Sequence, residues 1–138
     1  MNEDDDLGAL CAGAGRSLAE AERPVLERHG LSMWQYVVLS ALAHEAAPSQ
    51  LVLAQQIHYD KTRLIALLDG LEAAGLVGRE PDPGDRRART VRLTPEGIRR
   101  HAEVQAAIRV VEDRKLAGLT PEARRVLRSA LAHLANSG

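Results

Sequence analysis

Apolar residues recur at three- and four-residue spacing over most of the chain, which is the spacing of one face of an α-helix. This pattern predicts six helices, over about 5–29, 31–46, 49–57, 61–74, 95–117 and 121–135. Pro24 is expected to bend or interrupt the first helix, and Gly30 to end it. The prediction is a chain built mainly of helices.

Four helix starts carry recognisable capping residues. Ser32 is followed three residues later by Gln35, which is the pattern of a capping box. Asp60 precedes the fourth helix as an N-cap. Thr94-Pro95 and Thr120-Pro121 repeat one device, with threonine as N-cap and proline at the first helical position. These signals place the helix starts from local sequence alone.

Between Gly75 and Thr94 the helical period is lost. The segments LVGRE (76–80) and TVRL (90–93) are short and contain valine, and the intervening PDPGDRRAR has prolines and a glycine that disfavour helix. The chain therefore predicts a two-stranded hairpin with arginines at its tip and return arm, namely Arg86, Arg87, Arg89 and Arg92. A short helix, a longer helix and a basic hairpin in this order are typical of a winged helix-turn-helix.

Composition supports one small helical domain. The 138 residues are 45% hydrophobic but include no Phe, one Trp and two Tyr, so Leu, Val and Ala must build the core. The formal net charge is -1, yet it is unevenly distributed. Residues 3–6 are all acidic, whereas residues 79–100 contain seven arginines and four acids. A nucleic-acid-binding function is therefore compatible with the near-neutral total.

Other classes of protein are disfavoured. The single Cys11 excludes an internal disulfide and a cysteine zinc cluster, and suits a reducing cytoplasm. No apolar run approaches the roughly 18 residues of a membrane span, and the acidic N-terminus is unlike a signal peptide. There is no glycine-rich phosphate loop, zinc signature or nucleophile beside a base. We expect a cytoplasmic protein that is not an enzyme and has no cofactor or metal.

The stretch LVLAQQIHYDKTRLIALLDGLEAAGLVGREPDPGDRRARTVRLTPEG resembles the core of MarR-type (multiple antibiotic resistance regulator) transcription factors, and GLSMWQYVVLSAL resembles their second helix. The likeness extends over roughly residues 7–136. It implies one MarR-like domain over 1–138, with a winged helix-turn-helix lobe at about 32–93 and a wing at 76–93. Helical regions at about 7–30 and 95–136 would join two copies in a homodimer.

The resemblance also implies how DNA would be bound. Recognition helices of the dimer would enter consecutive major grooves of a pseudo-palindromic double-stranded operator, with half-sites roughly 34–36 Å apart, and the wings would reach the minor groove. In the wing, Asp85 and Arg87 match an Asp-x-Arg pair in which the carboxylate orients the guanidinium. Arg86 and Arg89 match wing-tip arginines that meet phosphates or the minor groove.

Recognition-helix positions carry over in the same way. Lys61, Thr62 and Arg63 occupy its first turn, where side chains face DNA. Ser49 and Gln50 open the preceding helix and are candidates for phosphate contacts. Three positions depart from the family pattern, because Ile65 and Ala66 replace a usual Thr and Arg and Gly70 replaces a usual Arg. Ile65 can instead touch a thymine methyl group.

The family resemblance implies a small-molecule switch. Many members release DNA when a ligand binds near the junction of the two regions, and we expect Arg16 and Trp34 to line such a pocket for a small anionic or aromatic effector. One branch responds to cysteine oxidation, so a redox repressor using Cys11 is an alternative. The apolar neighbours of Cys11 favour a buried, inert thiol or a dimer-packing residue. A winged helix used only for protein contacts is a further alternative.

Overall fold

The computed structural model describes residues 1–82 and 84–138, and the side chains of residues 82 and 85–88 lie outside that description. The chain forms mainly helices with one hairpin, as predicted. The elements in chain order are α1 (Leu7–Arg28), α2 (Met33–His44), α3 (Gln50–Gln56), α4 (Lys61–Ala73), β1 (Val77–Asp82), β2 (Asp85–Leu93), α5 (Pro95–Lys115) and α6 (Pro121–Ala135).

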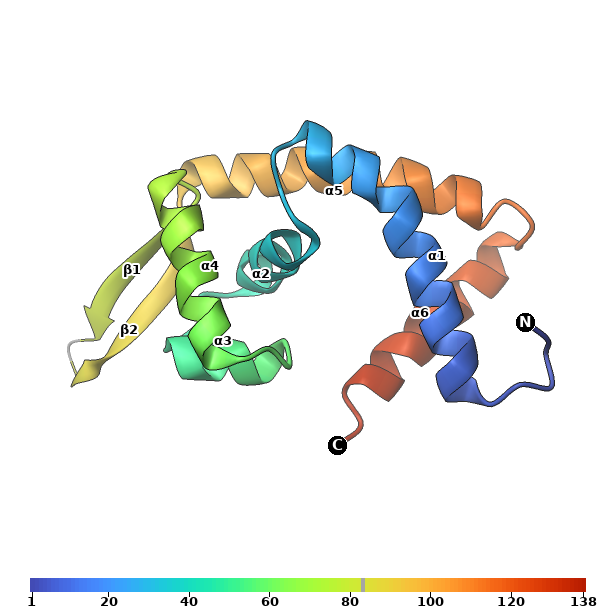
Figure 1. The fold of residues 1–138 in the computed structure, drawn as a ribbon, viewed down its shortest axis with the longest axis horizontal. Coiled ribbons are helices and arrows are strands. Elements are labelled where there is room, and N and C mark those ends of the chain that lie inside the picture. Colours follow the sequence, from blue (N-terminus) through green and yellow to red (C-terminus); the bar gives the residue numbers. More distant parts are fainter. Residues whose placement is uncertain (83) are drawn as a thin grey trace.

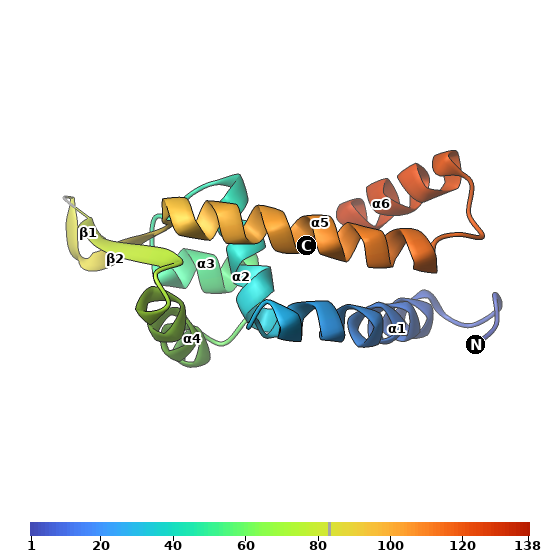
Figure 2. The same cartoon turned by 90° about the horizontal axis from the view of Figure 1, so that it is seen from above.

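The long helix α5 connects two differently built regions (Figures 1 and 2). At its N-terminal end lie α2, α3, α4 and the β1–β2 hairpin, at its C-terminal end lies α6, and α1 runs beside α5 from that end back toward α2. Hydrogen bonds tie α1 to α5 at two places. Lys115 Nζ donates to Ser17 Oγ at 2.8 Å, and Arg100 Nη1 donates to the His29 carbonyl at 3.0 Å.

The capping predictions are confirmed. Ser32 and Gln35 form a complete capping box at α2. Thr94 accepts the Gly97 N–H and Thr120 accepts the Ala123 N–H, and each threonine is followed directly by a proline. Gly30 follows α1 with φ of 68°, in the left-handed region where glycine avoids the steric cost of a side chain. Pro24 was expected to bend or interrupt α1, and an interruption is wrong, because the helix runs through Pro24 to Arg28.

The hydrophobic core lies in the lobe formed by α2, α3, α4, the hairpin and the first half of α5. Its most deeply buried side chains are Val38, Leu39, Leu53, Leu64, Leu68, Leu71, Leu76, Val91 and Val104. By contrast, α1 buries only Val25 and Leu26 near its C-terminus, and α6 buries no residue within the single chain. The chain thus packs one lobe fully and leaves two helices largely uncovered.

The hairpin is antiparallel, and its register pairs Val77 with Leu93 and Arg79 with Val91. A third segment joins it, because Ala47 and Val91 exchange two backbone hydrogen bonds of 2.8 and 2.9 Å. This pairing was not predicted from the sequence, where Ala47-Pro48-Ser49 indicated only a break between helices. It attaches the base of the wing to the start of the helix-turn-helix.

Within the described part of the chain, no helix combines the length and apolarity needed to cross a bilayer.

Candidate nucleic-acid interface

Helices α3 and α4 form the helix-turn-helix. Ser49 Oγ accepts the Val52 N–H at 3.1 Å and so caps α3, and Asp60 Oδ2 accepts the Arg63 N–H at 2.9 Å and caps α4. Between them His58 takes a left-handed conformation with φ of 54°, which lets the chain reverse within four residues. The Tyr59 N–H then bonds to the Ala54 carbonyl at 2.9 Å and closes the turn.

Helix α4 has one buried face and one exposed face. Leu64, Leu68 and Leu71 are buried in the core, at the i, i+4, i+7 spacing of a helix stripe. The predicted recognition residues Lys61, Thr62 and Arg63 are all exposed in the first turn, and Ile65 is 36% exposed. The structure therefore brings these four residues together at the outward N-terminal end of α4.

Two predicted phosphate contacts have partners inside the protein. Ser49 Oγ is the cap of α3, and Gln50 Oε1 accepts a hydrogen bond from Arg79 Nη1 at 3.0 Å. Both side chains are only partly exposed. Their roles in DNA binding stay predictions, but part of their hydrogen-bonding capacity already holds the lobe together.

Arg79 is a residue of this site that sequence reasoning missed. Its side chain is 11% exposed, and besides Gln50 it contacts Asp69 Oδ1 at 2.5 Å and Glu72 Oε1 at 3.1 Å. The hydrogen bond and the charge of Arg79 lower the pKa of Glu72, and the same contact raises the pKa of Arg79. The available signal was a pair of acids on a helix predicted to face DNA, a position where carboxylates need a cation nearby.

The hairpin extends from this helix-turn-helix as a wing (Figure 1). Arg89, opposite Pro81 in the register, has an exposed side chain. The side chains of Asp85, Arg86 and Arg87 lie outside the described part of the structure, although their backbone forms the start of β2. Their predicted contacts with each other and with DNA therefore stay predictions.

Known proteins match this arrangement. Residues 29–88, which hold the whole helix-turn-helix and most of the hairpin, match the model of the MarR family. Over its full length the chain superimposes on a MarR-family transcriptional regulator from Rhodococcus sp. RHA1 with a TM-score of 0.88 and 27% identity, covering 100% of this chain and 99% of that one.

The chain belongs to the MarR family. This is a family of transcriptional regulators, so the predicted fold and the prediction that the chain is not an enzyme are both confirmed.

Two further similar proteins are informative. The transcriptional repressor CouR, in a complex with a 23-mer DNA duplex, is 28% identical with a TM-score of 0.84, covering 95% of this chain and 93% of that one. The regulator PrsX of Escherichia coli is 30% identical over 96 residues, which are 67% of this chain and 57% of PrsX. The chain thus spans little more than half the length of curated relatives such as PrsX.

The two residues expected to line an effector pocket in this MarR-family protein are not brought together. Trp34 is 40% exposed and packs on Tyr59, with ring centroids 4.4 Å apart, at the helix-turn-helix. Arg16 is exposed on α1. Neither residue lines the cavity between α1 and α2, so their role as an effector pair stays a prediction.

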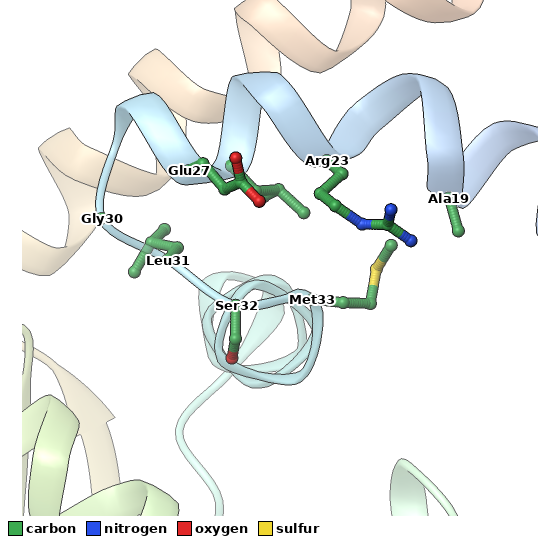
Figure 3. Close-up of a pocket in the computed structure, with 8 residues that line it drawn as sticks. Ala19, Arg23, Glu27, Gly30, Leu31, Ser32 and Met33 are labelled. Atoms are coloured by element: carbon green, nitrogen blue, oxygen red, sulfur yellow. The ribbon is translucent and has the colours of Figure 1, made fainter.

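A cavity of about 590 Å³ lies at the elbow between α1 and α2. It is lined by Ala19, Arg23, Leu26, Glu27, Gly30, Leu31, Ser32 and Met33. Figure 3 shows Arg23 of α1 and Met33 of α2 reaching toward one another across it. Arg100 of α5 holds the carbonyl of His29 beside this elbow. The cavity thus combines apolar walls with one cation and one carboxylate.

A buried polar contact joins α2 to α5. His101 is 7% exposed, lies 3.1 Å from Ser40 Oγ through its Nε2, and stacks on Tyr36 with centroids 5.5 Å apart. Burial, and to a lesser extent the charge of His44, lower the pKa of His101. Among the described residues, no three His, Cys, Asp or Glu side chains gather as metal ligands would.

Cys11 is exposed on α1. Of the two expectations, a buried inert thiol is therefore not found in the single chain, because α1 extends beyond the lobe and buries only Val25 and Leu26 near its C-terminus. The alternative, a residue that packs in a dimer, is compatible with this position. Helix α6 is similarly uncovered, with exposed apolar side chains at Val126, Leu127, Leu131 and Leu134.

Proposed function

We propose that this protein is a homodimer that binds double-stranded DNA sequence-specifically and represses transcription until a small-molecule effector releases it. The first turn of α4 carries the proposal. Lys61 and Arg63 are exposed at the positive end of the helix, where cations are unfavourable for the isolated helix. A phosphate or base acceptor outside the protein accounts for their placement, since base edges and phosphates are acceptors for both.

The wing supports the same conclusion. It projects from the lobe that holds α4, so that helix and hairpin can contact neighbouring grooves of one duplex (Figure 1). CouR, which the chain resembles in fold, is a repressor bound to a DNA duplex. The alternative of a winged helix used only for protein contacts does not account for exposed cations at both elements.

The test is fluorescence anisotropy with two duplexes of equal length. One is selected from a random pool by the protein itself, and the other has mixed sequence. We expect tighter binding to the selected duplex, and affinity for both that falls as salt rises from about 50 to 200 mM. A protein that binds neither duplex at the lower salt would support the protein-contact alternative.

The uncovered helices support the proposed dimer. Apolar side chains of α6 recur at three- and four-residue spacing, and Val126, Leu127, Leu131 and Leu134 are 38% to 61% exposed in the single chain. Such a face is stable in water when a second copy covers it, in a two-fold interface expected to exceed about 2,000 Å². The regions at about 7–30 and 95–136 would form this interface, and Cys11 lies within the first of them.

The effector site that we propose is the elbow cavity. Its Arg23 can pair with an anionic group, and Leu26, Leu31 and Met33 can cover an apolar or aromatic portion. A crystal structure of CouR from Rhodococcus jostii RHA1 contains p-coumaroyl-CoA, an acyl thioester with an aromatic end. A ligand at this elbow would act where α1 joins α2 and where Arg100 holds α5, and it needs only a few kcal/mol of preference for the non-binding arrangement.

Two matched variants separate the elbow cavity from the pair suggested by the sequence. Aromatic carboxylates and p-coumaroyl-CoA are added to the protein on its selected duplex, and release is followed by anisotropy. Arg23→Gln should weaken the response to an effective compound, and Arg16→Gln should leave it unchanged. The opposite result would place the effector beside Arg16.

A further inference from the structure

Arg79 joins three elements of the DNA-binding lobe through one guanidinium. It stands on β1, its Nη1 donates to Gln50 at the start of α3, and its Nη2 donates to Asp69 and Glu72 on α4. These donor–acceptor distances are 3.0, 2.5 and 3.1 Å. The Arg79 side chain is 11% exposed, whereas those of Asp69 and Glu72 are 62% and 45% exposed, so the guanidinium side of these ion pairs is shielded from water and the carboxylate side is not.

The geometry of these contacts requires an arginine. A planar guanidinium presents several N–H groups in a rigid fork, and here two nitrogens serve acceptors on two different helices. A lysine ammonium has the same charge, but as a single point donor it cannot span this arrangement. The contacts therefore define an orientation of α4 relative to β1 and α3, in addition to compensating two carboxylates.

The contacts lie at the opposite end of α4 from the exposed first turn. Glu72 lies nine positions after Arg63, which is a lever of roughly 13 Å at 1.5 Å per residue. A change of about 5° in the direction of the helix would move its first turn by on the order of 1 Å. A displacement of this size weakens hydrogen bonds to base edges, whereas contacts with the flexible phosphate backbone can adjust to it.

We propose that Arg79 is a positioning residue for sequence discrimination, which holds the recognition helix at the angle needed to distinguish base pairs without itself contacting DNA. This inference rests on the proposed DNA-binding function. The proposed role affects sequence preference more than overall affinity. Loss of Arg79 should lower the preference for the selected duplex more than it lowers the affinity for DNA in general.

The experiment compares affinities for the selected and the mixed-sequence duplex. Arg79→Met should reduce the ratio of the two affinities about tenfold, the size of one good base contact. Arg92→Met is the matched control, because Arg92 lies opposite Gly78 in the same hairpin, is exposed, and loses the same charge. It should leave the ratio unchanged. Compared with Arg79→Met, Arg79→Lys should restore the affinity for mixed-sequence DNA but not the ratio of the affinities for the selected and mixed-sequence duplexes.

A second variant tests the acceptors and does not depend on how well Arg79→Met folds. Asp69→Asn combined with Glu72→Gln keeps the guanidinium and should lower the ratio as Arg79→Met does. Adding both changes to Arg79→Met should produce no further fall. The proposal is overturned if Arg79→Lys restores the full ratio, or if Arg79→Met and Arg92→Met weaken both duplexes equally. A parent protein that binds neither duplex would instead contradict the proposed function.

Discussion

Gly97, in the first turn of α5, lies against the backbone of Leu76 at the start of the wing. A Cβ placed on Gly97 would stand 2.0 Å from the Leu76 carbonyl oxygen and 3.0 Å from its carbon. The same oxygen accepts the Thr94 N–H at 3.1 Å, so it cannot move away without losing that bond. The base of the wing and the long helix are thus held in backbone contact.

Gly97→Ala should therefore destabilise the protein. The added methyl group forces α5 and the hairpin apart, at a cost of about 1–3 kcal/mol in the free energy of unfolding. Gly70→Ala is the control, since nothing lies within 4 Å of its Cβ position in α4. There the change should stabilise by up to about 1 kcal/mol through helix propensity. Urea unfolding followed by circular dichroism measures both, and equal effects would contradict the close contact.

The wing and α4 should contribute differently to DNA binding. Arg86→Ala and Arg87→Ala are expected to weaken binding to selected and mixed-sequence DNA alike and to reduce the salt dependence by roughly one unit per lost phosphate contact. Arg63→Ala should relax the preference at one or two base pairs, by about 1–3 kcal/mol if its contact is bidentate. Binding titrations at several salt concentrations test this. If all three variants lost affinity equally on every DNA sequence, the proposed difference between the wing and α4 would be refuted.

Leu131→Glu should convert the protein to a monomer. Leu131 is 43% exposed on the uncovered face of α6, and a carboxylate there would lose its hydration in the proposed apolar interface without gaining a partner. Ser129→Glu adds the same charge on the opposite side of the helix, two residues earlier, and should leave the dimer intact. Sedimentation at micromolar concentration distinguishes the two states. A parent protein that sediments as a stable monomer would remove the dimer proposal.

Stability should fall as the pH is lowered through the ordinary histidine pKa of about 6.5. The pKa of His101 is lowered by burial, so below pH 6.5 the unfolded chain takes up a proton that the folded chain does not. The loss levels off once the pH is below the folded pKa. His101→Phe, which can keep the stacking on Tyr36, should reduce this dependence, and His58→Asn on the exposed turn should retain it. Thermal unfolding between pH 7.5 and 5 provides the measurement.

Cys11→Ser should bind DNA normally and respond to the effective ligand as the parent does. A reactive thiolate needs nearby cations or polar donors. The neighbours of Cys11 on its helix face are Leu7, Leu10 and Ala14, and the first cation after it is Arg16, more than a turn away. If peroxide released the parent from its duplex but not Cys11→Ser, the redox alternative would replace the ligand-switched repressor.

Local signals in the sequence determined the helix starts and the hairpin. Ser32, Thr94 and Thr120 cap helices through hydrogen bonds that span three residues, so their neighbours in sequence are enough to predict them. The exposure of Thr62 was predictable for a similar reason, because helical periodicity places it opposite the stripe of Leu64, Leu68 and Leu71. These features depend on backbone geometry within a few residues.

Only the tertiary structure decided how those elements are held together. Arg79 meets a glutamine 29 residues earlier, and Ala47 pairs with Val91 across the lobe, contacts that no local spacing indicates. The elbow cavity is lined by Arg23, although Arg16 and Trp34 were the pocket residues predicted from the sequence. Residue type and periodicity specify which side chains project from a given face of a helix. The packing of several elements on one core specifies which of those side chains meet, because that depends on all of the elements at once.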